Sequence, residues 1–132
     1  MKKKKIRCQY CGTRAVLRPD YVAKGKRARG VLLYVCGRYP RCDAYVGVHK
    51  DTCKPLGTLA NKSLRTKRRL AHEAFDVLWK SGLMNKAQAY EWIQAEFSLS
   101  EEDAHIGMFS EQMCDELIAA CEAFVSTIQI AA

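Results

Sequence analysis

The sequence predicts an α+β protein, in which a small antiparallel sheet is followed by a three-helix C-terminal part. Short runs rich in β-branched and aromatic residues are confined to the first third of the 132 residues. Two close cysteine pairs flank the clearest of these runs. Beyond it, apolar residues recur at steps of three and four, which is typical of helices packed against a common core.

The first cysteine pair is Cys8 and Cys11, and the second is Cys36 and Cys42. Four thiolates presented by two tight turns, or knuckles, are the usual ligand set of a tetrahedral structural Zn²⁺ site. Gly12 and Gly37 each follow a cysteine, where we expect the turn to require a positive φ angle. The first third is therefore predicted to be a small antiparallel zinc ribbon with Zn²⁺ as its cofactor.

An alternative ligand set remains open at this stage. His49 and Cys53 follow the second pair at a spacing that can ligate zinc. Either residue could replace one of the four cysteines.

The elements of this ribbon are expected to be short. Val31 to Val35 is the clearest strand, because it is a continuous run of aliphatic and aromatic residues. The pattern predicts further strands over 15–17, 21–23 and 44–48, and a mobile basic hairpin tip over 24–30.

Three helices are predicted in the remaining chain, over 61–81, 85–97 and 110–127. In the first, Leu64, Ala71, Phe75 and Leu78 share one face, with Leu70 and Val77 beside them. Cys114 and Cys121 fall on the apolar face of the last helix, where a core position is expected. The predicted domains are a zinc ribbon with a basic N-terminal arm, 1–54, and a helical part packed on the ribbon, 55–132.

The charge is strongly uneven along the chain. Residues 1–54 contain 15 Lys or Arg and 3 Asp or Glu. Residues 81–132 contain 1 Lys or Arg and 9 Asp or Glu. A small zinc module with such a basic excess most often binds nucleic acid. The predicted contacts join the arm Lys2–Lys5 to Lys24, Lys26, Arg27, Arg29, Arg38, Tyr39, Arg41, Arg65 and Arg69. The alternative is that this charge only keeps the protein soluble and contacts no nucleic acid.

The second knuckle, Cys-Gly-Arg-Tyr-Pro-Arg-Cys over 36–42, resembles those in the C-terminal zinc ribbons of type IA DNA topoisomerases. The resemblance covers about residues 6–48 and implies binding of single-stranded DNA. Topoisomerase activity is not implied, because the chain has no catalytic domain of that kind.

A broader resemblance spans nearly the whole chain. The runs 44–50 and 55–60, with Tyr90-Glu91-Trp92 and 105–109, look like a family of small phage and prophage proteins. That family is described as zinc-finger-containing and of unknown function. It implies a zinc ribbon joined to a helical segment.

No enzyme motif is present, since the chain lacks a Walker loop, a G-x-S-x-G elbow and an H-E-x-x-H pair. We therefore expect no catalytic activity. Seven cysteines without an apolar leader favour a reducing, cytoplasmic location, and no run is long enough for a membrane helix.

The predicted function is single-stranded DNA binding by a phage or prophage protein. The alternative is a protein-interaction module that modulates a host protein, as an anti-defence or regulatory factor.

Overall fold

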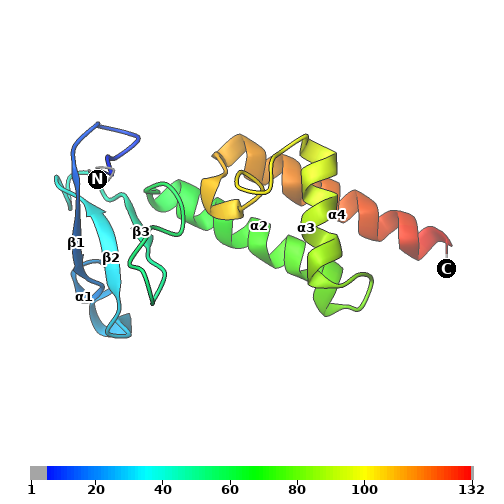
Figure 1. The fold of residues 1–132 in the computed structure, drawn as a ribbon, viewed down its shortest axis with the longest axis horizontal. Helices are drawn as coiled ribbons and strands as arrows, with labels where there is room; N and C mark the ends of the chain where they lie inside the picture. Colours follow the sequence, from blue (N-terminus) through cyan, green and yellow to red (C-terminus); the bar gives the residue numbers. More distant parts are fainter. Residues whose placement is uncertain (1–5, 132) are drawn as a thin grey trace. The chain divides into compact units, whose positions relative to one another are not determined.

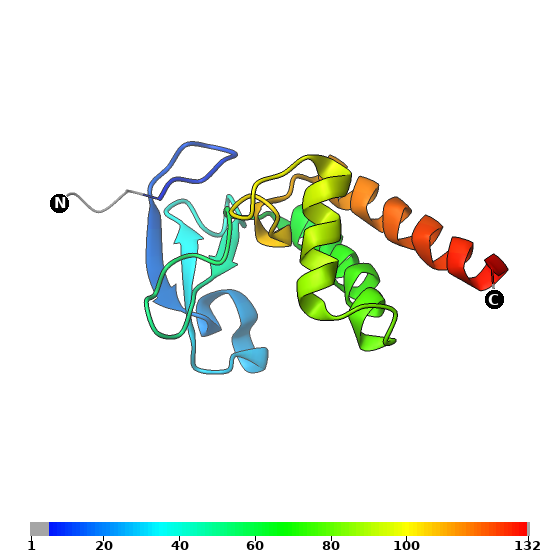
Figure 2. The same cartoon turned by 45° about the vertical axis from the view of Figure 1, so that its right-hand side comes forward.

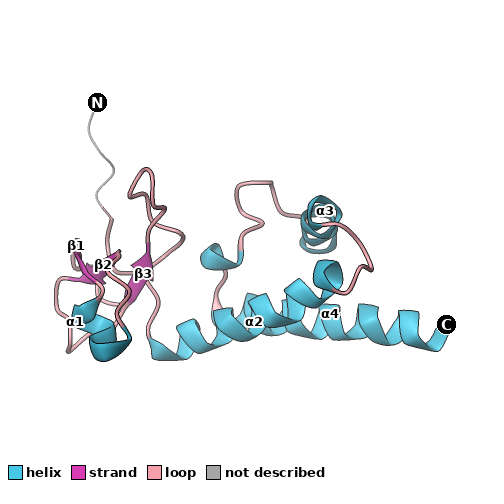
Figure 3. Cartoon of the chain, turned by 90° about the horizontal axis from the view of Figure 1, so that it is seen from below, coloured by secondary structure: helices cyan, strands magenta, loops and turns pink. Residues whose placement is uncertain are grey.

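The computed structural model describes residues 6–131, and the arm Lys2–Lys5 lies outside them. Contacts divide the chain into two units, the first ending at Lys62 and the second beginning at Ser63. All three strands belong to the first unit and the three long helices to the second (Figures 1 and 3). This is the predicted α+β order of a three-stranded antiparallel sheet followed by helices.

The sheet has the order β1-β2-β3, with β1 at Ala15–Pro19, β2 at Leu32–Cys36 and β3 at Tyr45–Gly47. Ala15 pairs with Cys36 and Pro19 with Leu32. The cysteine knuckles therefore adjoin one end of the β1–β2 pair, and the connection 20–31 adjoins the other (Figure 2). Five residues of strand separate these ends by about 13 Å.

The predicted strand over 21–23 is wrong, because this segment forms the short helix α1, Tyr21–Lys24. The 3₁₀ turn η1, Gly25–Arg27, follows it. Asp20 turns the chain here: its carbonyl accepts hydrogen bonds from the N–H groups of Ala23 and Lys24. Its buried carboxylate also accepts one from the N–H of Arg29, at 2.7 Å. The basic tip is thus an organised turn built on Asp20.

The first unit has a small apolar core. Its part around the cysteines consists of Cys8, Ala15, Cys36, Ala44 and Leu59, and Leu33, Val35 and Ala60 are also buried in this unit. Cys8 and Cys36 are predicted metal ligands, so this part of the core and the cysteine cluster are one structure. A core of so few side chains holds the sheet only weakly without a metal.

Residues 48–60 return to the sheet instead of starting the helical part. A hairpin closes between His49 and Lys54, and an isolated bridge then joins Tyr45 to Ala60. The contact boundary between the units therefore falls at Lys62.

The second unit contains α2 (Lys62–Lys80) apart from its first residue, α3 (Lys86–Phe97), the 3₁₀ turn η2 (Ile106–Met108) and α4 (Glu111–Ala131). Asn85 begins α3 with a capping box, in which its side chain and that of Gln88 each accept the other's backbone N–H. The buried residues include Leu64, Ala71, Phe75, Leu78, Ala89, Ile93, Phe109, Cys114, Leu117 and Cys121. Leu70 and Val77, expected beside this core, are 41% and 44% exposed.

None of the helices in the described part of the chain is both long and apolar enough to cross a bilayer.

Candidate metal centre

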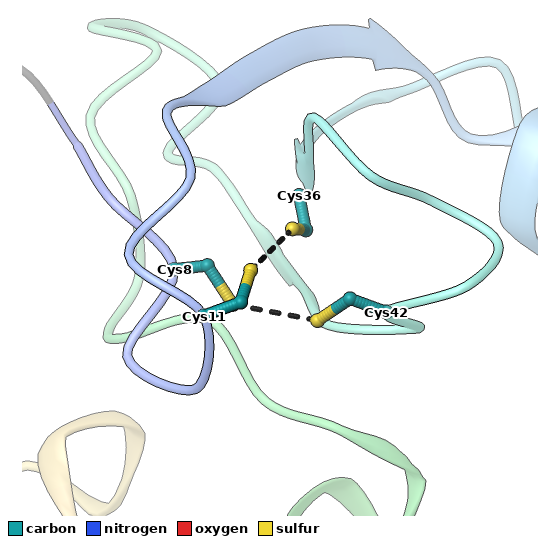
Figure 4. A group of neighbouring side chains, drawn as sticks. All are labelled: Cys8, Cys11, Cys36 and Cys42. Atoms are coloured by element: carbon teal, nitrogen blue, oxygen red, sulfur yellow. Dashed lines mark hydrogen bonds between the residues drawn. The ribbon is translucent and has the colours of Figure 1, made fainter.

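The four predicted cysteines come together at one end of the sheet (Figure 4). Cys8 and Cys11 lie in the loop before β1, Cys36 ends β2, and Cys42 lies in the following loop. The Sγ atoms of Cys8 and Cys42 are 3.5 Å apart, and those of Cys11 and Cys36 are 3.4 Å apart. All four sulfurs lie within 4.8 Å of one another.

Local hydrogen bonds shape each knuckle. In the first, the N–H of Gly12 donates to the Cys8 carbonyl at 2.9 Å, and Gly12 has a φ of 74°. This is the left-handed conformation expected at that glycine. In the second, the N–H of Tyr39 donates to the Cys36 carbonyl, and the N–H of Arg38 lies 3.5 Å from the Cys36 Sγ.

Gly37 is required for a different reason from the one predicted. Its φ is not positive in the structure. A Cβ atom at this position would lie 2.8 Å from the Arg14 carbonyl oxygen and 3.0 Å from the Thr13 Cγ2. The two knuckle regions approach so closely that only a residue without a side chain fits between them.

The sulfur positions fit a tetrahedral zinc ion. Zn–S bonds of about 2.3 Å place tetrahedral sulfurs roughly 3.8 Å apart. The observed separations of 3.4 and 3.5 Å, with an upper limit of 4.8 Å, bracket that value. Four thiolates are also the donor set of closed, structural zinc sites, which leave no position open for a substrate.

His49 and Cys53 are not part of this cluster. The metal-ligand group found among the described residues contains the four cysteines alone. Both residues belong to the separate hairpin, in which the Cys53 N–H donates to the His49 carbonyl at 2.9 Å. The open alternative of a His49 or Cys53 ligand is therefore not supported.

The thiols differ in acidity before metal binding. Burial raises the pKa of Cys8, and it raises the pKa of Cys36 to about 12. The exposed Cys11 has hydrogen bonds to Thr13, whose hydroxyl lies 3.2 Å from its Sγ, and these lower the pKa of Cys11 to about 6. Zinc must displace protons from the buried thiols, whereas the hydrogen bonds from Thr13 make the Cys11 thiol easier to deprotonate.

Residues beside the ligands hold the segment that leads into α2. The Gln9 side-chain amide donates to the Leu59 carbonyl at 2.6 Å, and the Tyr10 hydroxyl accepts from the N–H of Asn61 at 3.1 Å. Asp43, next to Cys42, accepts a hydrogen bond from the N–H of Lys62. Sequence reasoning missed Gln9 and Asp43, because their partners lie 50 and 19 residues away and no local pattern marks them.

The nine predicted nucleic-acid contacts fall into three groups. Arg38 and Arg41 line an open hollow of about 540 Å³ beside Cys11 and Cys42, and Tyr39 lies half-buried between them in sequence. The tip residues Lys24, Lys26, Arg27 and Arg29 adjoin the other end of the β1–β2 pair. Arg65 and Arg69 belong to α2 in the helical unit. The sheet therefore separates the knuckle group from the tip group.

Two cysteine knuckles on a three-stranded antiparallel sheet define a small zinc-ribbon protein carrying a helical unit. Residues 4–124 match the model of a family described as a zinc-finger-containing domain, and the chain belongs to that family. No curated protein and no solved structure matched the chain.

Proposed function

We propose that this protein binds single-stranded nucleic acid, with single-stranded DNA preferred, through its zinc-containing sheet unit. The observation that carries the proposal is a set of exposed basic side chains without counter-ions. Lys24, Lys26, Arg27 and Arg29 are all exposed. Within residues 6–131 none of them forms an ion pair, and the pairs found, Lys67–Asp115 and Lys80–Asp76, lie in the helical unit. Lys and Arg side chains that are not already in ion pairs are available to contact the phosphates of a nucleic-acid backbone.

The anchoring of the tip supports this role. Asp20 is only 1% exposed and its carboxylate holds the N–H of Arg29, so the basic turn is fixed before any ligand arrives. A loop that is ordered beforehand loses less conformational entropy on binding than a mobile one. The four basic side chains of the tip therefore form a prepared phosphate-binding turn.

Aromatic side chains near the knuckles offer rings on which unpaired bases can stack. Tyr10 is 44% exposed although its hydroxyl is engaged by Asn61. Tyr39 lies between the two knuckle arginines and is half-buried. Stacking on such rings requires unpaired bases, which favours single strands over duplex. The preference for DNA, a phage or prophage origin and a reducing cytoplasmic setting belong to this proposal and rest on the sequence features described above.

A second candidate function is supported by the helical unit. Leu70 and Val77 are two turns apart on α2 and substantially exposed, while α4 exposes acidic residues including Asp115, Glu116 and Glu122. Exposed apolar side chains on one helix and carboxylates on another offer apolar and charged contacts to a partner protein. This unit would allow the protein to bind and modulate a host protein. Both candidates are binding roles without catalysis.

Fluorescence anisotropy with the zinc-loaded chain tests the main proposal. Labelled single-stranded and duplex oligonucleotides are titrated at several salt concentrations. We expect tighter binding of the single strand and a steep loss of affinity with salt. Replacing Lys26, Arg27 and Arg29 together by Gln should flatten the slope of log K against log salt by roughly 2, since each phosphate contact on a single strand contributes about 0.7.

Glu116→Gln on α4 is the matched control, and we expect it to leave both affinity and slope unchanged. If the zinc-loaded protein binds no oligonucleotide even at low salt, the nucleic-acid proposal is wrong. The protein-binding role of the helical unit then becomes the leading candidate.

A further inference from the structure

The hollow beside the zinc ligands presents hydrogen-bond donors and acceptors side by side. Cys11, Arg38, Arg41 and Cys42 line it, and its volume of about 540 Å³ falls within the range of small-ligand sites. Both arginines are exposed, and neither forms an ion pair within the described residues. Guanidinium groups only donate hydrogen bonds, whereas metal-bound thiolate sulfurs accept them.

The charges of this hollow differ from those of the tip. Four thiolates exceed the charge of Zn²⁺ by two, and the guanidinium groups of Arg38 and Arg41 offset that excess. Asp43, beside Cys42, adds a negative charge, and Arg7, whose guanidinium donates to the Gly12 carbonyl, adds a positive one. The surroundings of the hollow are therefore close to neutral, while the tip contains four basic residues beside the carboxylate of Asp20. The electrostatic attraction on a phosphate group is therefore much stronger at the tip than in the hollow.

The second knuckle holds the backbone from which the two arginine side chains project. Arg38 and Arg41 lie within the loop whose ends are the ligands Cys36 and Cys42. Inside that loop the N–H of Cys42 donates to the Arg38 carbonyl at 3.3 Å. A short loop tied at both ends to one metal ion positions its side chains more firmly than a free loop would.

We infer that this hollow is a base-recognition subsite for one unpaired nucleobase, an inference that rests on the proposed single-strand binding. The guanidinium groups of Arg38 and Arg41 donate to a carbonyl oxygen or ring nitrogen of the base. The Sγ of Cys11 or Cys42 accepts an N–H from its amino or imino group. An unpaired base exposes such mixed edges, and in a duplex its Watson–Crick edge is occupied. The tip, at the other end of the sheet, binds the phosphates.

The test compares two labelled strands of about ten nucleotides on the zinc-loaded full chain, one bearing bases and one abasic throughout. We expect the wild-type protein to prefer the base-bearing strand about tenfold. Replacing Arg38 and Arg41 together by Gln should reduce this preference to the part that stacking on the tyrosines supplies, with little change in the salt slope, because the lost contacts are to a base. Zinc content and circular dichroism establish that the variant is folded.

The paired change Arg14→Gln with Arg18→Gln is the matched control, since both arginines are exposed on or beside β1 outside the hollow. It should affect both strands equally. If the wild-type protein binds the two strands equally, the base subsite is wrong. Because both strands are still bound in that case, the proposed nucleic-acid binding is not contradicted. A reduced salt slope in the Arg38/Arg41 variant, with the preference for bases retained, would reassign these arginines to phosphate contacts. Absence of binding to either strand contradicts the proposed function itself, and the subsite with it.

Discussion

The carboxylate of Asp43 accepts a hydrogen bond from the backbone N–H of Lys62, with 3.1 Å between Oδ2 and N. Lys62 is the first residue of α2, and the first amides of a helix have no partner within the helix. The residue next to the zinc ligand Cys42 thus supplies an acceptor for the start of the long helix. Tyr10, inside the first knuckle, does the same for the N–H of Asn61.

Removing this acceptor should destabilise the protein without releasing its metal. We expect Asp43→Ala to lower the free energy of unfolding by roughly 0.5–2 kcal/mol, the usual effect of losing a helix cap. Urea unfolding of the zinc-loaded protein measures this change. Asp51→Ala, at an exposed carboxylate in the 49–54 hairpin, is the control and should have little effect. Equal stabilities of the two variants would show that the Asp43 contact contributes nothing.

The metal should be an integral part of the first unit. Purified protein is expected to contain about one zinc per chain, because four thiolates complete a single tetrahedral site. Cys36→Ser should lose the metal and unfold the sheet, since the apolar core is too small to fold alone. Cys114→Ser, in the buried core of the helical unit, should retain it. Full zinc content in Cys36→Ser would contradict the four-cysteine site and reopen the case for His49 or Cys53.

Zinc binding should release protons. Burial raises the pKa of Cys8, and it raises that of Cys36 to about 12, so both thiols keep their protons at neutral pH in the metal-free protein. Zinc competes with those protons, so its affinity should rise with pH and fall on acidification. Calorimetric titration in buffers of different ionisation enthalpy measures the release. A zinc affinity independent of pH between about 6 and 8 would contradict this assignment of protons.

Gly37 should tolerate no side chain. In Gly37→Ala the new Cβ would meet the Arg14 carbonyl oxygen at 2.8 Å, a backbone atom that cannot move away freely. We expect weaker zinc binding and a loss of roughly 1–3 kcal/mol in stability, as for overpacking elsewhere. Gly30→Ala is the control, because its φ of 78° strains the backbone but no atom lies within 4 Å of the new Cβ. Its zinc affinity should stay at the wild-type level, measured by competition with a chelator.

Tyr39 should contribute to nucleic-acid affinity by stacking. Tyr39→Ala is expected to weaken binding of a single strand by roughly 1–3 kcal/mol, with no change in the salt slope. Anisotropy titrations at several salt concentrations separate this effect from a phosphate contact. An unchanged affinity would indicate that the half-buried ring only packs in the knuckle.

Several features were predictable because they depend on neighbouring residues. The spacing of Cys8 with Cys11, and of Cys36 with Cys42, indicates the ligands, since a tight turn brings both sulfurs of a pair to one side. The capping residue Asn85 and the apolar periodicity of α2 similarly place helices within one or two residues of their bounds. The segment 21–23 was misread as a strand because a short apolar run has no periodicity that separates the two structures.

The sequence by itself determined that a sheet precedes three long helices, that four cysteines offer a zinc site and that the charge is uneven, because each follows from residue type and local spacing. Only the tertiary structure decided that Arg38 and Arg41 share a hollow with Cys11 of the first pair while the tip adjoins the other end of the sheet. It also decided that Asp20 anchors that tip and that Asp43 holds the first amide of α2. These relationships depend on strand register and on hydrogen bonds between residues distant in the chain, which no local pattern encodes.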